Sequence, residues 1–339
     1  MLVIGKLIYY LLFFFNLFHF IVNTPILFLV FNRPDATRQV FQVIRRAKPT
    51  KLFVAADGPR LNKESEKEKC ELVRNIVTQI DWDCELTTLF RETNLGCGKA
   101  VSEAITWFFE HVEEGIILED DCLPAESFFY YCPELLHMYR NDEKIMHIGG
   151  CNFQNGIKRG RGDYYFSSIA HIWGWATWKR AWDKYDYNMN GYSDNGCIEM
   201  LNKLYRQNHI INYWVNIYNA MSNGMIDTWD YQWQYTLLIN NGMSISPNIN
   251  MVSNIGFGIN ATHTIEENRL VSDLPVFEVT NLKHPVRIIL SKIADAYTYK
   301  HIYGIAISKN WFDKLYIPNK IYRLKKMLLK INYINFNRG

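Results

Sequence analysis

Three consecutive carboxylates, Glu119, Asp120 and Asp121, are the residues of this sequence best suited to chemistry. They follow the short apolar run "GIIL" at 115–118. Adjacent acids repel one another unless something positive lies between them. Carboxylate oxygens suit Mg²⁺ or Mn²⁺, and such an ion can also hold a diphosphate. The alternative is a solvated acidic turn at a helix N-terminus, where carboxylates are favourable in any case.

A second pair of acids lies among large aromatic residues in "DTWDYQW", residues 227–233. Asp227 and Asp230 are three residues apart and therefore share a face if the segment is a helix. A carboxylate beside Trp229 and Trp233 can have a raised pKa and can take a proton from a sugar hydroxyl. The aromatic faces could also support a sugar ring. The alternative is an amphipathic core helix with solvated acids.

The segment "HIWGWATW", residues 171–178, offers a similar aromatic platform in Trp173 and Trp175. Gly174 between them lets the backbone approach a ligand closely. Tryptophan-rich packing in the core is the alternative.

Two single residues could also contact a phosphate or a metal. Lys99 lies in "GCGKAVSEA", which matches neither a P-loop nor a dinucleotide fingerprint, because Val101 stands where the third glycine belongs. The glycines there indicate a tight turn that packs a helix on a sheet, and Lys99 could still approach a phosphate. His263 in "NATHT" is a possible metal ligand or phosphate contact, although an isolated loop histidine is usually neither.

The elements that must position these residues follow from the apolar pattern. Strands are predicted at 25–31, 51–57, 84–90, 115–118 and 144–150, with 25–31, 51–57 and 115–118 buried, and helices at 34–47, 62–80, 96–112 and 125–139. This alternation predicts an α/β fold with an open, mostly parallel sheet. Ligands bind beyond the carboxyl ends of such strands, where "NRPD", "DGPR", "RETNLGCGK" and "EDD" occur. Further helices are predicted within 194–240, and a short strand and a loop after residue 241.

Together these segments resemble the metal-dependent GT-A glycosyltransferases, and within them the N-acetylglucosaminyltransferase I-like group and its bacterial relatives. The resemblance is carried by "PILFLVFNRP", "LFVAADGPR", "FEHVEEG", "IILEDDCLPAESFFYY", "IWGWATW", "TWDYQW" and "SISPNINMVSNIGFG", which span about residues 25–258. It implies a GT-A, Rossmann-like fold of the nucleotide-diphospho-sugar transferase superfamily. It also implies inverting transfer from a nucleotide-sugar donor, most often UDP-linked, to a glycan or lipid-linked acceptor in cell-surface polysaccharide or glycoconjugate synthesis.

The resemblance also implies roles for single residues. Arg33 and Asp57 match positions that hold the nucleotide base, and Asp120 matches the position that contacts the ribose. Asp121 matches the direct Mn²⁺ ligand, with Glu119 in a supporting role.

The catalytic base of the family falls at Asp230. The family has two adjacent acids between tryptophans here, whereas this chain has Asp230-Tyr231-Gln232-Trp233, so Asp227 stays in reserve. A sugar nucleotidyltransferase is one alternative, although "FNRPDATR" lacks the glycine-rich loop that such enzymes carry after the first strand. A non-enzymatic, membrane-associated scaffold with the same fold is the other.

Charge and composition divide the chain into three parts. Residues 309–339 hold eight basic residues and one acid, while the remainder holds 29 basic and 33 acidic residues. A uniformly basic nucleic-acid-binding protein would not have this distribution. We expect an apolar N-terminal helix at 1–23, a catalytic domain at 24–280 and a basic helical tail at 281–339. Within the domain, 24–150 is the expected nucleotide-binding half and 151–280 the acceptor half.

The two ends of the chain raise the question of a membrane. Residues 1–22 carry one charge, Lys6, and could be a membrane anchor, a helix packed in the fold or a signal peptide. A basic amphipathic tail suits an anionic membrane surface. The seven scattered cysteines indicate reduced thiols. We therefore expect a protein of the cytoplasm or of the cytoplasmic face of a membrane.

Overall fold

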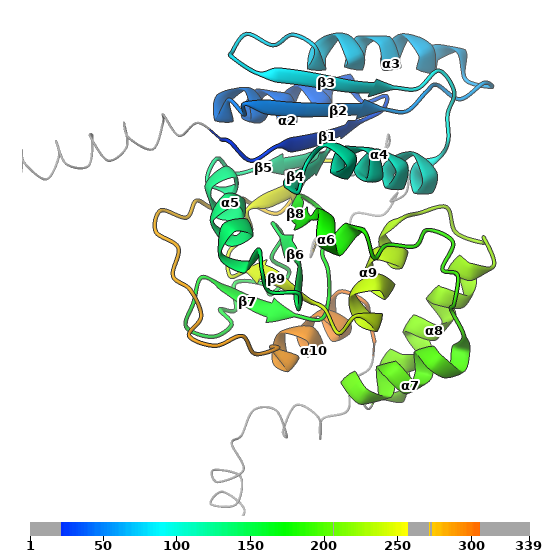
Figure 1. Ribbon diagram of the computed structural model, residues 1–339, viewed down its shortest axis with the longest axis vertical. Helices are drawn as coiled ribbons and strands as arrows, with labels where there is room; N and C mark the ends of the chain where they lie inside the picture. Colours follow the sequence, from blue (N-terminus) through cyan, green and yellow to red (C-terminus); the bar gives the residue numbers. More distant parts are fainter. Residues whose placement is uncertain (1–21, 206, 257–270, 272, 306–339) are drawn as a thin grey trace, which may run out of the picture.

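The computed structural model describes residues 22–205, 207–256, 271 and 273–305. Its central feature is an eight-stranded sheet with strand order β3-β2-β1-β4-β8-β6-β9-β7 (Figure 1). In chain order the strands are β1 (Ile26–Val30), β2 (Lys51–Ala56), β3 (Glu85–Phe90), β4 (Glu114–Glu119), β6 (Ile145–Gly149), β7 (Tyr164–Ser167), β8 (Trp175–Trp178) and β9 (Met243–Pro247). A separate antiparallel pair joins β5 (Cys122–Pro124) to β10 (Val252–Asn254).

The pairing confirms the predicted fold class. β3, β2, β1 and β4 are mutually parallel, as are β6 and β9. β8 is antiparallel to both of its neighbours, β4 and β6, and β7 is antiparallel to β9. The sheet is therefore open and mostly parallel, with two strands reversed in its C-terminal half.

Helices cover both faces of the sheet (Figure 1). One face packs on α2 (Pro34–Ala47), α3 (Glu64–Val77) and α5 (Phe128–Tyr139), and the other on α4 (Cys97–His111), α6 (Lys179–Trp182) and α9 (Asp230–Ile239). β1 shows why: Ile26, Phe28 and Val30 enter the first core, while Leu27 and Leu29 enter the second. Side chains alternate along a strand, so a run that is apolar throughout is buried on both faces.

A third cluster contains α7 (Asp194–Leu204), α8 (Asn208–Ser222) and α10 (Lys292–His301). α10 is anchored to the body by Asp295, which is 2% exposed and accepts hydrogen bonds from the hydroxyls of Ser167 and Ser168, both at 2.6 Å. The body therefore extends past residue 280, where the sequence predicted an appended tail. The sequence prediction places α10 in the tail because the chain is helical and increasingly basic from about residue 283.

Three predictions fall wholly or largely outside the described residues: the N-terminal helix at 1–23, His263, and the tail beyond residue 305. Within the part of the chain that the structure describes, no helix is long and apolar enough to cross a bilayer.

Candidate functional site

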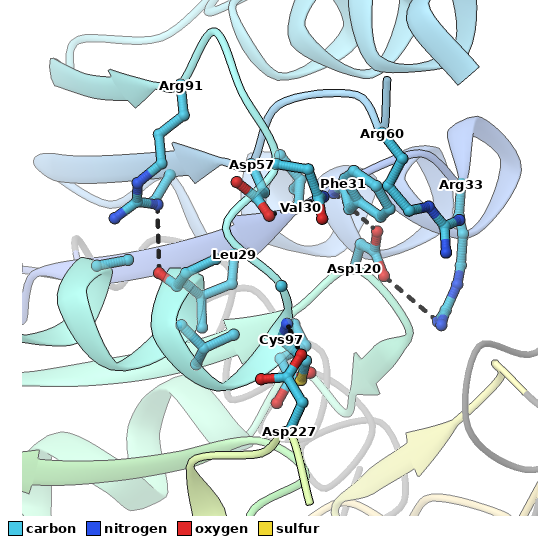
Figure 2. Close-up of a pocket in the computed structure, with 17 residues that line it drawn as sticks. Leu29, Val30, Phe31, Arg33, Asp57, Arg60, Arg91, Cys97, Asp120 and Asp227 are labelled. Carbon is cyan, nitrogen blue, oxygen red and sulfur yellow. Dashed lines mark hydrogen bonds and ion pairs between the residues drawn. The ribbon is translucent and has the colours of Figure 1, made fainter. Parts of the chain in front are cut away.

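A cavity of about 300 Å³ lies beyond the carboxyl ends of β1, β2 and β4 (Figure 2). Parallel α/β sheets bind ligands at this edge, and the volume is at the lower end of the range for small-molecule pockets. Its charged lining residues are Arg33, Asp57, Arg60, Arg91, Glu119, Asp120 and Asp227. All four polar segments that follow predicted strands contribute lining residues to it.

Arg33 is the positive group between the acids of the triplet. Its guanidinium donates a hydrogen bond to Asp121 and lies 3.5 Å from Oδ1 of Asp120. The other oxygen of Asp120 accepts the backbone N–H of Phe31 at 3.1 Å. Burial opposes the charge of Arg33, but Asp120 and Asp121 outweigh it and raise the pKa of Arg33. Within the described structure, then, Arg33 offsets part of the repulsion between Asp120 and Asp121.

Glu119 is the acid of the triplet that faces the cavity without a hydrogen bond from any described residue. Burial raises its pKa, and the charges of Asp121, Asp120 and Asp230 raise it further, while Arg33 offsets part of the effect. Burial and Asp121 also raise the pKa of Asp120, against Arg33. A carboxyl with a raised pKa in a cavity is a candidate for proton transfer.

Asp57 uses its carboxylate to hold the wall of the cavity. It accepts hydrogen bonds from the backbone N–H groups of Leu95 (3.0 and 3.1 Å) and Gly58 (2.9 Å), and from the side chain of Asn94 (2.9 Å). Burial raises the pKa of Asp57 in spite of these bonds. Asp57 therefore ties the β3–α4 connection to the end of β2.

Arg60 and Arg91 are cavity residues that we did not single out from the sequence. Arg60 pairs with Glu66 of α3, which is 4% exposed, and its guanidinium lies 5.6 Å from the centre of the Phe31 ring. Arg91 donates a hydrogen bond to the carbonyl of Ala100 at 3.2 Å. A signal was available, because both arginines stand in the polar segments directly after β2 and β3.

The two candidate bases lie in different surroundings. Asp227 lines the cavity and accepts the backbone N–H groups of Cys97 (3.1 Å) and Gly98 (2.9 Å) in the first turn of α4 (Figure 2). A helix N-terminus is where a negative charge is favourable. Asp230 begins α9, accepts a hydrogen bond from the hydroxyl of Thr228 and is not among the lining residues. It is close enough to raise the pKa of Glu119.

Trp175, Trp229 and Trp233 do not form a platform for a sugar, and that prediction is wrong. Each is at most 1% exposed. Trp175 and Trp229 stack on each other at 5.6 Å, and Trp233 donates a hydrogen bond to Nδ1 of His147 at 3.2 Å. A ring without an exposed face cannot stack on a ligand, so core packing explains these residues.

The remaining predicted site residues lie away from this cavity. Trp173 is half-buried and packs edge-on against Phe153 at 5.5 Å. Gly174 has a φ of +63°, and a Cβ there would lie 2.7 Å from the side chain of Val252, so the fold itself requires glycine. Lys99 pairs with Glu103 at 3.7 Å on the outer face of α4.

The acids fit a divalent ion only together with a ligand. Among the described residues, no group of three or more His, Cys, Asp or Glu side chains is arranged to hold a metal. Mg²⁺ is usually bound through one or two carboxylates while phosphate oxygens supply further positions. Asp121, with Glu119 in support, could therefore hold an ion that a diphosphate shares, but the two do not form a metal site by themselves.

Comparisons with known proteins give weak likenesses. No family model and no curated protein matches the chain. Among solved structures, HddC from Yersinia pseudotuberculosis is 8% identical and covers 50% of this chain and 87% of its own, with a TM-score of 0.31. UDP-glucose pyrophosphorylase complexed with UDP-glucose is 12% identical (48% and 78% covered, TM-score 0.30). 4-Diphosphocytidyl-2C-methyl-D-erythritolsynthase from Anaerococcus prevotii is 7% identical (48% and 75%, 0.29). These values do not assign the chain to a family.

Proposed function

We propose that this chain is a glycosyltransferase that transfers a sugar from a nucleoside-diphosphate donor, with UDP-linked sugars as the first candidates. The observation that carries the proposal is the cavity at the carboxyl edge of a parallel sheet, which is lined by three arginines and four carboxylates. Guanidinium groups suit phosphate oxygens, and carboxylates suit ribose hydroxyls and a divalent ion. The cavity therefore offers partners for each polar part of a nucleotide sugar.

In this proposal the lining residues divide the donor between them. Asp120 accepts a hydrogen bond from a ribose hydroxyl. Arg33 and Asp57 border the space for the base, and Asp57 does so through the β3–α4 connection that it holds in place. Arg60 and Arg91 contact the diphosphate. Lys99, on the outer face of α4, has no part in donor binding unless α4 shifts.

A divalent ion would be held by Asp121, with Glu119 in support, and would supply positive charge to the departing nucleoside diphosphate. Asp230 takes the proton from the acceptor hydroxyl as the oxygen of that hydroxyl attacks the anomeric carbon. The bond from that carbon to the diphosphate breaks on the opposite face, which inverts the configuration through an oxocarbenium-like transition state. Asp227 is less suited to accept a proton, because hydrogen bonds from two backbone N–H groups stabilise its charged form.

The connection after the first strand argues against a sugar nucleotidyltransferase. β1 ends at Val30 and α2 begins at Pro34, so only three residues, none of them glycine, connect them. A glycine-rich loop that closes over a nucleoside triphosphate has no room there.

The test is a panel of UDP-, GDP- and dTDP-sugars incubated with the full chain, with and without Mn²⁺. Release of the nucleoside diphosphate, increased by an acceptor, supports the transferase. Pyrophosphate released from UTP and a sugar 1-phosphate indicates the nucleotidyltransferase instead. Absence of both products, together with absence of UDP binding in calorimetry, indicates a non-enzymatic protein and overturns the proposal.

A further inference from the structure

A second hollow, of about 660 Å³, lies along the outer face of α4. One wall is a stripe of helix residues from Lys99 to Glu110, including Glu103 and Trp107, at the three- and four-residue spacing that keeps side chains on one face. The other wall is the 185–188 segment that follows α6. The stripe runs for about 17 Å along the helix, which is longer than a single sugar ring.

The walls combine aromatic rings with polar groups. Trp107 is half-buried and held edge-on against Phe53 at 5.5 Å. Tyr185 stacks on Trp182 at 4.2 Å and donates a hydrogen bond to the carbonyl of Trp229 at 3.0 Å. Tyr187 is also half-buried and stands at one end. The rings of Trp107 and Tyr185 are held in place by these contacts, and such rigidity reduces the entropy lost on binding.

The polar groups favour an uncharged ligand. One lysine, Lys99, is already paired with Glu103, and the second carboxylate of the hollow, Glu110, has no ion pair among the described residues. The lining therefore carries a formal charge of −1, which disfavours an anionic ligand. Carboxylate oxygens accept hydrogen bonds from hydroxyl groups.

The hollow adjoins the candidate active site. A Cβ placed on Gly98 would lie 2.7 Å from both the hydroxyl of Tyr187 and Oδ1 of Asp227. Tyr187 lines the hollow and Asp227 lines the cavity, so the two sites flank the same turn of α4. A chain lying along α4 would thus have one end beside the cavity.

We propose that the groove between α4 and the 185–188 segment binds the neutral glycan part of the acceptor. This rests on the proposed function, because it assumes that the cavity beside Asp227 holds a sugar donor. The burial of Trp175, Trp229 and Trp233 removes the platform predicted from the sequence, and Trp107 and Tyr187 provide partly exposed rings in its place.

The test is a printed glycan array probed with the full chain and with Trp107→Ala, Tyr187→Ala and Tyr297→Ala. Tyr297 is a half-buried tyrosine on α10 and serves as the matched control. We expect neutral oligosaccharides to bind, and titration with the best of them to show affinity weakened about tenfold in the two groove variants and unchanged in Tyr297→Ala. Trp107→Phe keeps an aromatic face and should retain most of the binding.

Binding confined to acidic glycans, binding unaltered in both groove variants, or no binding to any glycan would overturn the proposal. Near-UV circular dichroism shows whether each variant is folded. If Trp107→Ala is unfolded, Tyr187→Ala tests the proposal instead. Titration of the wild type with UDP, GDP and dTDP separates the two proposals. Glycan binding without nucleotide binding contradicts the transferase but supports a glycan-binding groove, whereas nucleotide binding without glycan binding supports the transferase and contradicts the groove.

Discussion

Arg33 competes with any divalent ion for the carboxylates of Asp120 and Asp121. Arg33→Met removes that charge, so we expect Mn²⁺ to bind at least about tenfold more tightly in the absence of nucleotide. The free Mn²⁺ signal in electron paramagnetic resonance measures this affinity. Arg38→Met, in an exposed arginine of the same helix, is the control and should change nothing. Unchanged Mn²⁺ affinity in Arg33→Met, or Mn²⁺ binding that survives Asp121→Ala, contradicts the metal assignment.

Variants of Asp230 and Asp227 distinguish a catalytic base from a carboxylate that caps a helix. We expect Asp230→Asn to lower the transfer rate about 100-fold or more while UDP still binds, because only the proton acceptor is lost. Asp227→Asn weakens the cap on α4 and should lower the free energy of unfolding by about 1 kcal/mol with a smaller effect on transfer. Rate assays and urea unfolding measure both. Loss of transfer in Asp227→Asn but not in Asp230→Asn would reverse the roles.

Glu119 should make stability depend on pH. Its pKa is raised in the folded protein, chiefly by burial, so the folded state holds the proton more tightly than the unfolded state. The contribution of Glu119 to the free energy of unfolding is fully present below the ordinary glutamate pKa of about 4.3. It is lost as the pH rises through the raised pKa. Glu119→Gln removes the titration, so it should gain stability relative to the wild type between pH 5 and pH 8.

Urea unfolding of the wild type and of Glu119→Gln at pH 5 and pH 8 measures the difference in stability between the two proteins. Buried His147 and His171 have lowered pKa values, about 3 and about 4, and act in the opposite direction, but they are present in both proteins and cancel. A constant difference between wild type and Glu119→Gln at the two pH values would show that Glu119 titrates normally.

At the scale of elements, a buried carboxylate on α10 accepts hydrogen bonds from the end of β7. Asp295→Ala leaves the hydroxyls of Ser167 and Ser168 without their acceptor, and we expect it to lower the free energy of unfolding by about 3 kcal/mol. Urea unfolding measures the change, with Lys292→Ala at an exposed position of the same helix as the control. A loss below about 1 kcal/mol would mean that Asp295 contributes little to holding α10 on the body.

Elements whose pattern is local were predictable, and those that depend on distant partners were not. β1 to β4 and their helices alternate along the chain, and the apolar runs of β1, β2 and β4 predict strands buried on both faces. β8 was missed because "WATW" has no such run. It becomes a strand only by inserting antiparallel between β4 and β6. The sequence predicts Trp175 of β8 as a binding residue because the abundance of tryptophan, rather than its burial, is visible in a sequence.

At the scale of the whole molecule, the candidate site draws on segments that the chain order alone could not bring together. The segments after β1, β2, β3 and β4 were expected at one edge, and they meet there. The contact of Asp227 with the first turn of α4 was not foreseeable, because it depends on where the 223–229 connection between α8 and α9 packs. Nor could the sequence show that Arg33 pairs with the triplet, since this requires the start of α2 to face the end of β4.

The uneven charge of the whole chain leads to a prediction about membranes. Residues 309–339 hold eight basic residues and one acid, and residues 1–21 carry a single charge. We expect the full chain to sediment with vesicles containing phosphatidylserine, and the basic contribution to fall in high salt. A truncated protein should begin at Val22 rather than later, because its buried carbonyl accepts the N–H of Thr50 at 3.1 Å. A protein of residues 22–308 should stay in the supernatant, and proteins that lack only 1–21 or only 309–339 should bind partially. Sedimentation of 22–308 with vesicles would locate the membrane contact in the body instead.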